Sequence, residues 1–141
     1  MVAIKGDMAE DVRAFFEAYG QPWFDRDAEA IASHYNQPLS MIRSGVLAVF
    51  ATQQAVLDNT KQVLSMWHPE GSSEDVATQL TEHGAGRSAV VHAKWGRWIV
   101  RLPDGGVVIA PECDYVLAKP QGQWKIILTA VDWNKTTNAP S

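Results

Sequence analysis

The sequence predicts an α+β domain, because helical patterns dominate its first half and strand patterns its second half. Up to residue 67, apolar side chains recur mostly at intervals of three and four residues, which is typical of amphipathic helices. After residue 74, β-branched and aromatic side chains form runs separated by the turn signals Asp-Gly-Gly and Pro-Gln-Gly. We therefore expect three helices packed on one face of a mostly antiparallel sheet.

The first helix is predicted from apolar side chains at positions 12, 15, 16 and 19, which are spaced as i, i+3, i+4 and i+7. Asp7 with Glu10 resembles a capping box at its start. Gly20 followed by Pro22 is typical of a helix end.

A shorter second helix is predicted in the segment FDRDAEAIASHY. Asp25 or Asp27 can cap it, and Pro38 ends it. Its buried stripe consists of Ala28, Ile31, Ala32 and Tyr35.

Residues 39–50 are rich in apolar side chains around Ser44-Gly45 and are interpreted as one or two short strands. A third helix is expected from about 52 to 67, ended by Pro69 and Gly71. The rest of the chain is expected to form a meander, with strands near 74–82, 88–101, 107–118 and 123–133.

The composition favours one domain over residues 1–134, followed by a polar tail at 135–141. The formal net charge of −4 and the scattered basic residues argue against nucleic acid and membrane surfaces as partners. The lone Cys113 excludes an intrachain disulfide. Because no apolar leader and no apolar run of 18 residues is present, we expect a soluble, cytoplasmic protein.

No metal and no cofactor is expected. The four histidines lack ligand spacing or a matching carboxylate, and neither a P-loop nor a GxGxxG motif occurs.

Two carboxylates stand at alternate positions in ECDYVL, the segment that begins at Glu112. On a strand, Glu112 and Asp114 lie on one face about 7 Å apart, so both point either into water or into a pocket. Arg43 shares its strand parity with Leu39 and Met41, so it faces the core if they do.

The order of elements resembles the NTF2-like superfamily, which includes the SnoaL-like cyclases and the ketosteroid isomerases. The resemblance rests on the aromatic first helix, the segment RDAEAIASHY, the Asp-Gly-Gly turn and the final hairpin YVLAKPQGQWKI. It implies a curved sheet that wraps around the helices as a cone and encloses a pocket. It also implies a homodimer through the sheet.

The resemblance assigns possible site residues. In the ketosteroid isomerase branch, a tyrosine and a protonated aspartate donate hydrogen bonds to an oxyanion. By position, Tyr19 and Asp114 correspond to these two donors, so they are the candidate catalytic residues. Where that branch keeps its general base, this sequence has Arg43, which cannot abstract a proton. A copy of the isomerase mechanism is therefore disfavoured. The resemblance still implies that Glu112 and Asp114 point into the cone.

Two interpretations of Arg43 stay open. In the functional interpretation it binds a substrate carboxylate or a developing enolate, while Asp114 or Glu112 orients water or substrate. In the structural interpretation it forms an ion pair with one of these acids or lies in solvent at the edge of its strand. Tyr19 is either a hydrogen-bond donor to a ligand or the last core residue of its helix. Two alternatives also apply to four tryptophans, which either line a pocket or only pack in the core. These are Trp23, Trp67, Trp95 and Trp98.

The leading functional hypothesis is a protein that binds an apolar metabolite bearing an oxygen or a negative charge. If it is an enzyme, cofactor-free isomerisation, cyclisation or hydration is expected. The alternative is a non-catalytic assembly module. It rests on a second apolar strand face that a second subunit would cover, formed by Ile109, Cys113, Tyr115 and Leu117.

Overall fold

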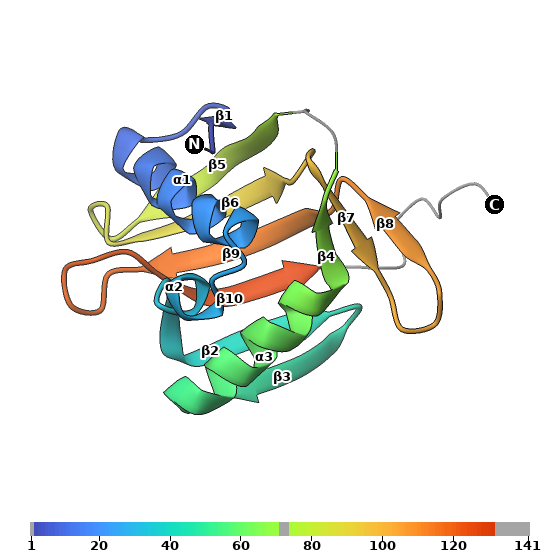
Figure 1. Cartoon of the computed structure of the whole chain (residues 1–141). Coiled ribbons are helices and arrows are strands. Elements are labelled where there is room, and N and C mark those ends of the chain that lie inside the picture. The colour runs from blue at the N-terminus through green and yellow to red at the C-terminus, as the bar shows by residue number, and fades with distance from the viewer. Residues whose placement is uncertain (1, 71–73, 132–141) are drawn as a thin grey trace.

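The computed structural model describes residues 2–70 and 74–131, and Figure 1 shows the path of the chain. It has three helices, α1 (Glu10–Phe24), α2 (Ala28–Ala32) and α3 (Gln53–Met66). The strands are β1 (Ile4–Lys5), β2 (Tyr35–Arg43), β3 (Val46–Phe50), β4 (Trp67–Pro69), β5 (Asp75–His83), β6 (Ser88–Lys94), β7 (Trp98–Arg101), β8 (Val107–Ile109), β9 (Glu112–Ala118) and β10 (Lys125–Val131). The predicted α+β class is confirmed. The predicted tail at 135–141 and the end of the last predicted strand lie outside the described residues.

The described strands form two sheets. A seven-stranded sheet has the order β1-β5-β6-β9-β10-β2-β3, and a three-stranded sheet has the order β4-β7-β8. Within the described part of the chain, only the pairs β1 with β5 and β10 with β2 are parallel. The prediction of a mostly antiparallel sheet is therefore confirmed.

The starts of the helices follow local capping chemistry in two of three cases. The Asp27 side chain accepts from the Ala30 N–H at 3.1 Å, and the Thr52 side chain accepts from the Ala55 N–H at 3.1 Å. The N-cap of α1 is Ala9, and no side chain caps the helix there. The capping box predicted at Asp7 is therefore wrong.

Helix α1 also continues past its predicted end and stops only after Phe24, with Pro22 in its last turn. Gly20 is needed inside the helix for close packing rather than for a helix end. A Cβ at this position would lie 2.9 Å from Cγ1 of Val2, so the N-terminal segment can approach the helix only because no side chain intervenes.

Tyr35 belongs to β2 and not to the second helix, which ends at Ala32. The strands β2 and β3 are joined at Ser44 and Gly45, whose φ values are 49° and 83°. Two successive positive φ angles are the signature of a type I′ hairpin turn, in which glycine is favoured.

Two of the predicted long strands are interrupted, at Trp95 and at Pro111. The second part of the first one (β7) and the first part of the other (β8) belong to the three-stranded sheet. The Trp95 N–H donates to the Pro111 carbonyl at 2.9 Å, and the Ala110 N–H donates to the Trp98 carbonyl at 2.9 Å. Pro111 has no N–H for a continuous ladder, which favours a break at this point. The short strands β1 and β4 were not predicted, because two or three residues carry no periodic signal.

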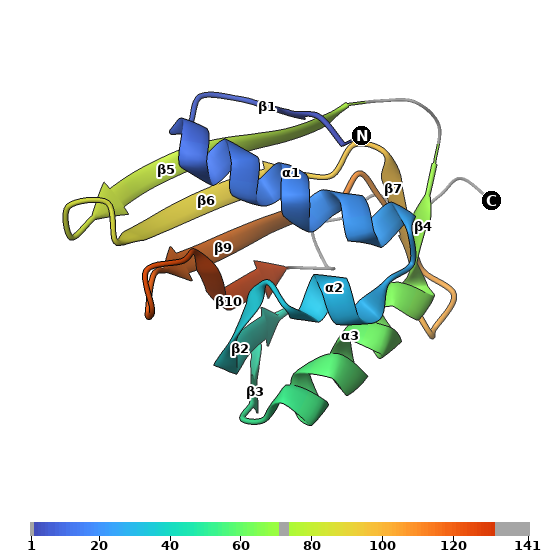
Figure 2. The same ribbon diagram turned by 60° about the vertical axis from the view of Figure 1, so that its left-hand side comes forward.

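The inner face of the seven-stranded sheet packs against α1. The ring of Phe16 lies 5.2 Å from that of Tyr115 and 6.4 Å from that of Trp95, measured between centroids. Figure 2 shows α1 lying in front of β5 and β6. No helix among the described residues is long and apolar enough to span a membrane.

Candidate functional site

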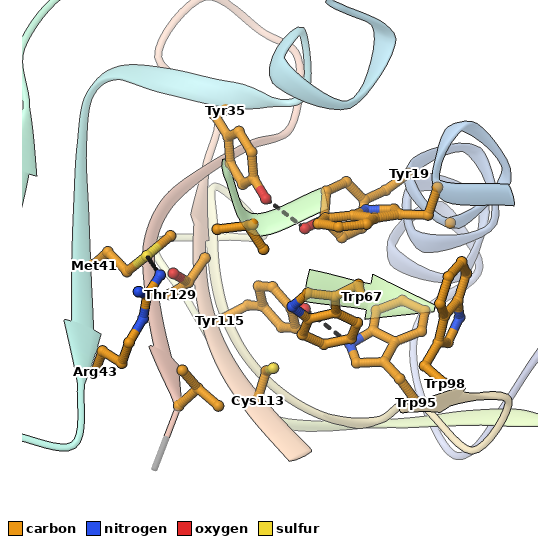
Figure 3. A pocket seen from close by; sticks show the side chains of 14 residues that line it. Tyr19, Tyr35, Met41, Arg43, Trp67, Trp95, Trp98, Cys113, Tyr115 and Thr129 are labelled. Atoms are coloured by element: carbon orange, nitrogen blue, oxygen red, sulfur yellow. Dashed lines mark hydrogen bonds between the residues drawn. The ribbon is translucent and has the colours of Figure 1, made fainter. Parts of the chain in front are cut away.

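An interior cavity lies between α1, α3 and the strands, and Figure 3 shows its lining side chains. Its volume is about 50 Å³ for the centres of water-sized molecules, which is more than the 10–15 Å³ that one water needs. Half of the lining residues are aromatic, namely Tyr19, Trp23, Tyr35, Trp67, Trp95, Trp98 and Tyr115.

The tryptophans form one corner of the cavity by packing on one another. Ring centroids of Trp23 and Trp67 are 5.4 Å apart, and both lie 6.4 Å from the ring of Trp98. Trp23, Trp67 and Trp95 thus lie in the wall where a substrate-binding role was expected, whereas that role itself stays a prediction. A wall of this kind suits a flat apolar guest.

Tyr19, near the end of α1, also lies where it was predicted, and its hydroxyl is paired. Its oxygen is 2.6 Å from the hydroxyl oxygen of Tyr35, and either group can be the donor. Burial raises the pKa of both tyrosines, so both hydroxyls keep their protons at neutral pH. Two hydroxyls joined by one hydrogen bond have one proton left, which a ligand oxygen in the cavity can accept.

A second polar pair lies beside the first. The Trp95 indole N–H donates to the Tyr115 hydroxyl at 2.9 Å, and both side chains are buried. The nearby Cys113 thiol is also buried, which raises its pKa to about 12. Cys113 is therefore a neutral wall residue and not a nucleophile.

Arg43 lines the cavity at its far side, which confirms that it faces inward with Leu39 and Met41. Its Nη2 lies 3.4 Å from the Met41 sulfur, and its buried Nε has no hydrogen-bond partner in the described structure. Burial lowers its pKa, although a guanidinium stays charged at any working pH. Among the described residues it forms no ion pair, so the interpretation of Arg43 as an ion-pair partner of Glu112 or Asp114 is excluded.

The predicted orientation of these two acids is wrong as well. The side chains of Glu112 and Asp114 are exposed on the outer face of the sheet, whereas Cys113, Tyr115 and Leu117 are buried inside. Burial decides which alternate residues of β9 face inward, because the strand turns its larger apolar side chains toward α1. The structure therefore does not bring Asp114 or Glu112 to Tyr19. Of the four apolar residues expected to be covered by a second subunit, only Ile109 is exposed, whereas Cys113, Tyr115 and Leu117 are buried within the subunit.

The outward carboxylates hold a histidine instead. His92 Nδ1 is 2.8 Å from Asp114 Oδ1, and His92 Nε2 is 2.9 Å from Glu112 Oε1. Hydrogen bonding to Asp114 and then to Glu112 raises the pKa of His92. The prediction that no histidine has a matching carboxylate is wrong here. Within the described ranges, no group of three His, Cys, Asp or Glu side chains could hold a metal ion.

Sequence reasoning missed several wall residues. Tyr35 was placed in a helix and Tyr115 on the outer face, while Met41 and Thr129 were not considered as lining. The alternation of apolar residues along β9 could have identified Tyr115, but no local pattern marks Thr129.

Comparison with known proteins identifies the fold. A family model described as "NTF2-like protein (DUF6841)" matches residues 9–132. No curated protein matches the sequence.

Three solved structures illustrate the likeness. An NTF2-like protein of unknown function from Shewanella oneidensis MR-1 has a TM-score of 0.58 and 17% identity, with 87% of this chain and 97% of that chain covered. A provisionally named calcium/calmodulin dependent protein kinase II association domain from Xanthomonas campestris has a TM-score of 0.58 and 15% identity, with 96% and 90% covered. A provisionally named aromatic ring hydroxylase from Novosphingobium aromaticivorans has a TM-score of 0.58 and 15% identity, with 86% and 85% covered. At these identities, the likeness shows the fold alone.

Proposed function

Because the chain belongs to the NTF2-like family, we propose that it binds a small, flat, largely apolar molecule that carries an oxygen or a negative charge. The site is the interior cavity, within the cone that the curved sheet and the helices form. The cytoplasmic location and the SnoaL-like subdivision expected from the sequence are part of this proposal.

The observation that carries the proposal is that one cavity combines aromatic walls with a hydrogen-bonded pair of hydroxyls. The hydroxyl oxygens of Tyr19 and Tyr35 are 2.6 Å apart. Indole and phenol rings offer flat apolar surface, and the spare hydroxyl proton offers one directed hydrogen bond. Such a site fits a single aromatic or unsaturated ring with a carbonyl, hydroxyl or carboxylate substituent. The likeness to a provisionally named aromatic ring hydroxylase is compatible with such a ligand.

Binding is better supported than catalysis. The cavity offers hydrogen-bond donors that could stabilise an oxyanion, namely the Tyr19 and Tyr35 pair and Arg43. Isomerisation, cyclisation or hydration would also need a base, and the described lining residues include no carboxylate and no histidine. We therefore propose a binding protein in which the tyrosine pair orients the ligand oxygen.

The test is a titration of the wild type and of Val63→Phe with phenol. Binding is monitored by ligand-observed NMR. Val63 lines the cavity, so the added ring should fill the void and abolish binding. Val49→Phe is the matched control, because Val49 is 58% exposed on β3 and its change should leave binding intact. A folded Val63→Phe protein that binds phenol as the wild type does would contradict the proposal.

A second candidate function is assembly as a homodimer through the outer face of the seven-stranded sheet. Leu47, Val49, Val76 and Leu80 are between 41% and 62% exposed, so apolar surface is open on β3 and β5. The likeness to a provisionally named association domain is compatible with this role. Sedimentation equilibrium should show a dimer that Leu47→Glu dissociates, and a wild-type monomer at micromolar concentration would argue against it.

A further inference from the structure

Three side chains meet beside one end of the cavity. Arg43 and Met41 line its wall, and Asn59 contacts Met41 from outside the lining. Arg43 and Met41 come from β2, and Asn59 comes from α3, one turn before the lining residue Val63. Arg43 Nη2 lies 3.4 Å from the Met41 sulfur, and Asn59 Nδ2 lies 3.9 Å from the same atom. The contact between Arg43 and Met41 is marked in Figure 3.

The combination is chemically mismatched. A guanidinium and a carboxamide are strong donors, whereas a thioether sulfur is among the weakest acceptors that a protein offers. The Arg43 Nε is buried and has no hydrogen-bond partner among the described residues, and Asn59 is only 9% exposed. A buried donor without a good acceptor costs free energy until one arrives.

We propose that these donors form an anion subsite, which holds the carboxylate of the ligand that the cavity binds. Arg43 supplies the planar fork that suits two carboxylate oxygens, and Asn59 supplies a further donor. The Met41 sulfur, which both donors contact, marks the position that we assign to the anion. Its unbranched, flexible side chain can swing aside when the carboxylate enters. The inference rests on the proposed ligand-binding function, to which it adds the charge of the ligand and the role of Asn59.

The geometry favours a carboxylate over a neutral oxygen. The Arg43 charge is half buried and forms no ion pair in the described structure, so an anion would compensate it where a neutral group would not. Arg43 and the tyrosine pair lie on different sides of the cavity in Figure 3. A ring between them can therefore present a carboxylate to Arg43 and a second oxygen to Tyr19.

The test compares benzoate with benzamide, which have nearly the same shape but differ in charge. For the wild-type protein we expect benzoate to bind about tenfold or more tightly by NMR titration, as hydrogen bonds to a charged group allow. Arg43→Gln should remove this preference, because the affinity for benzoate falls much more than the affinity for benzamide. Arg101→Gln is the matched control, because Arg101 is exposed on β7 and its loss changes only the overall charge.

Two further variants test the other members of the subsite. Asn59→Leu should reduce the preference for benzoate, with a larger loss of affinity for benzoate than for benzamide. Met41→Leu keeps the volume but removes the competing acceptor, so the preference should be kept or increased.

The outcomes separate the two proposals. Equal binding of benzoate and benzamide by the wild type would overturn the anion subsite and leave the cavity as a ligand site. Failure of phenol, benzoate and benzamide to bind would overturn both. A preference for benzoate that persists in Arg43→Gln would show that the anion is held elsewhere and would also overturn the subsite.

Discussion

The two buried hydrogen-bonded pairs, Tyr19 with Tyr35 and Trp95 with Tyr115, should respond differently to removal of one hydroxyl. Tyr115→Phe removes the acceptor that the Trp95 indole N–H has in the described structure, the Tyr115 oxygen at 2.9 Å. An indole N–H can only donate, and the Trp95 side chain is 4% exposed, so it keeps an unsatisfied buried donor. The expected loss is about 1–3 kcal/mol in the free energy of unfolding.

Tyr19→Phe leaves a different group behind. The Tyr35 hydroxyl, 2.6 Å from Tyr19 in the wild type, can rotate its proton into the cavity. The expected loss is therefore only about 0.5–1.5 kcal/mol. Tyr19→Phe should instead weaken binding of phenol, because the pair loses the hydroxyl that orients the ligand.

The assay is urea unfolding followed by far-UV circular dichroism, with the same slope expected for the wild type and both variants. For a chain of this length, a loss of about 1–3 kcal/mol lowers the thermal midpoint by roughly 3–10 °C. The comparison between the variants decides the matter. A larger loss in Tyr19→Phe than in Tyr115→Phe would refute the hydrogen-bond reasoning for the cavity.

Three other predictions concern particular residues. Gly20→Ala should lower the free energy of unfolding by about 1–3 kcal/mol, because the new Cβ would lie 2.9 Å from Val2 Cγ1, and Val2→Ala should restore most of the loss in the same urea assay. The Cys113 thiol should resist iodoacetamide in the native protein and react only in urea, since burial raises its pKa to about 12; rapid native labelling seen by mass spectrometry would argue against its burial. The pKa of His92 is raised in the folded state, so its stabilising contribution is present below about pH 6.5 and is lost as the pH rises through the raised value. Thermal midpoints measured across this range should fall less steeply in Asp114→Asn, and an unchanged slope would count against the His92 contact.

The sequence allowed the class of the fold and the positions of the three helices to be predicted, because these depend on local apolar periodicity. It also placed Tyr19 and Arg43 on inward faces, since helical spacing and strand parity fix the direction of a side chain. The C-terminal end of α1 was not predictable from its glycine and proline residues, because Gly20 allows close packing against Val2 and does not end the helix. The break of the long strands at Trp95 was also missed, since it depends on contacts with a distant segment.

The error at Asp114 has a simple physical origin. A shift of one residue in the phase of a strand moves every side chain to the other face. The resemblance placed the acids inside, whereas Cys113 and Tyr115 are the apolar set that burial favours. The partners of His92 lie 20 and 22 residues away on the neighbouring strand, so no local spacing could reveal them.

The most direct test of ligand binding in the interior cavity is the indole region of a ¹⁵N-correlated NMR spectrum during a phenol titration. Trp23, Trp67, Trp95 and Trp98 line the cavity, whereas Trp124 lies outside it and donates to Asp11 at 3.0 Å. We predict that the cavity indole signals shift in a saturable way and that the Trp124 signal stays in place. Unchanged cavity signals at saturating phenol, or a shift confined to Trp124, would contradict the proposal.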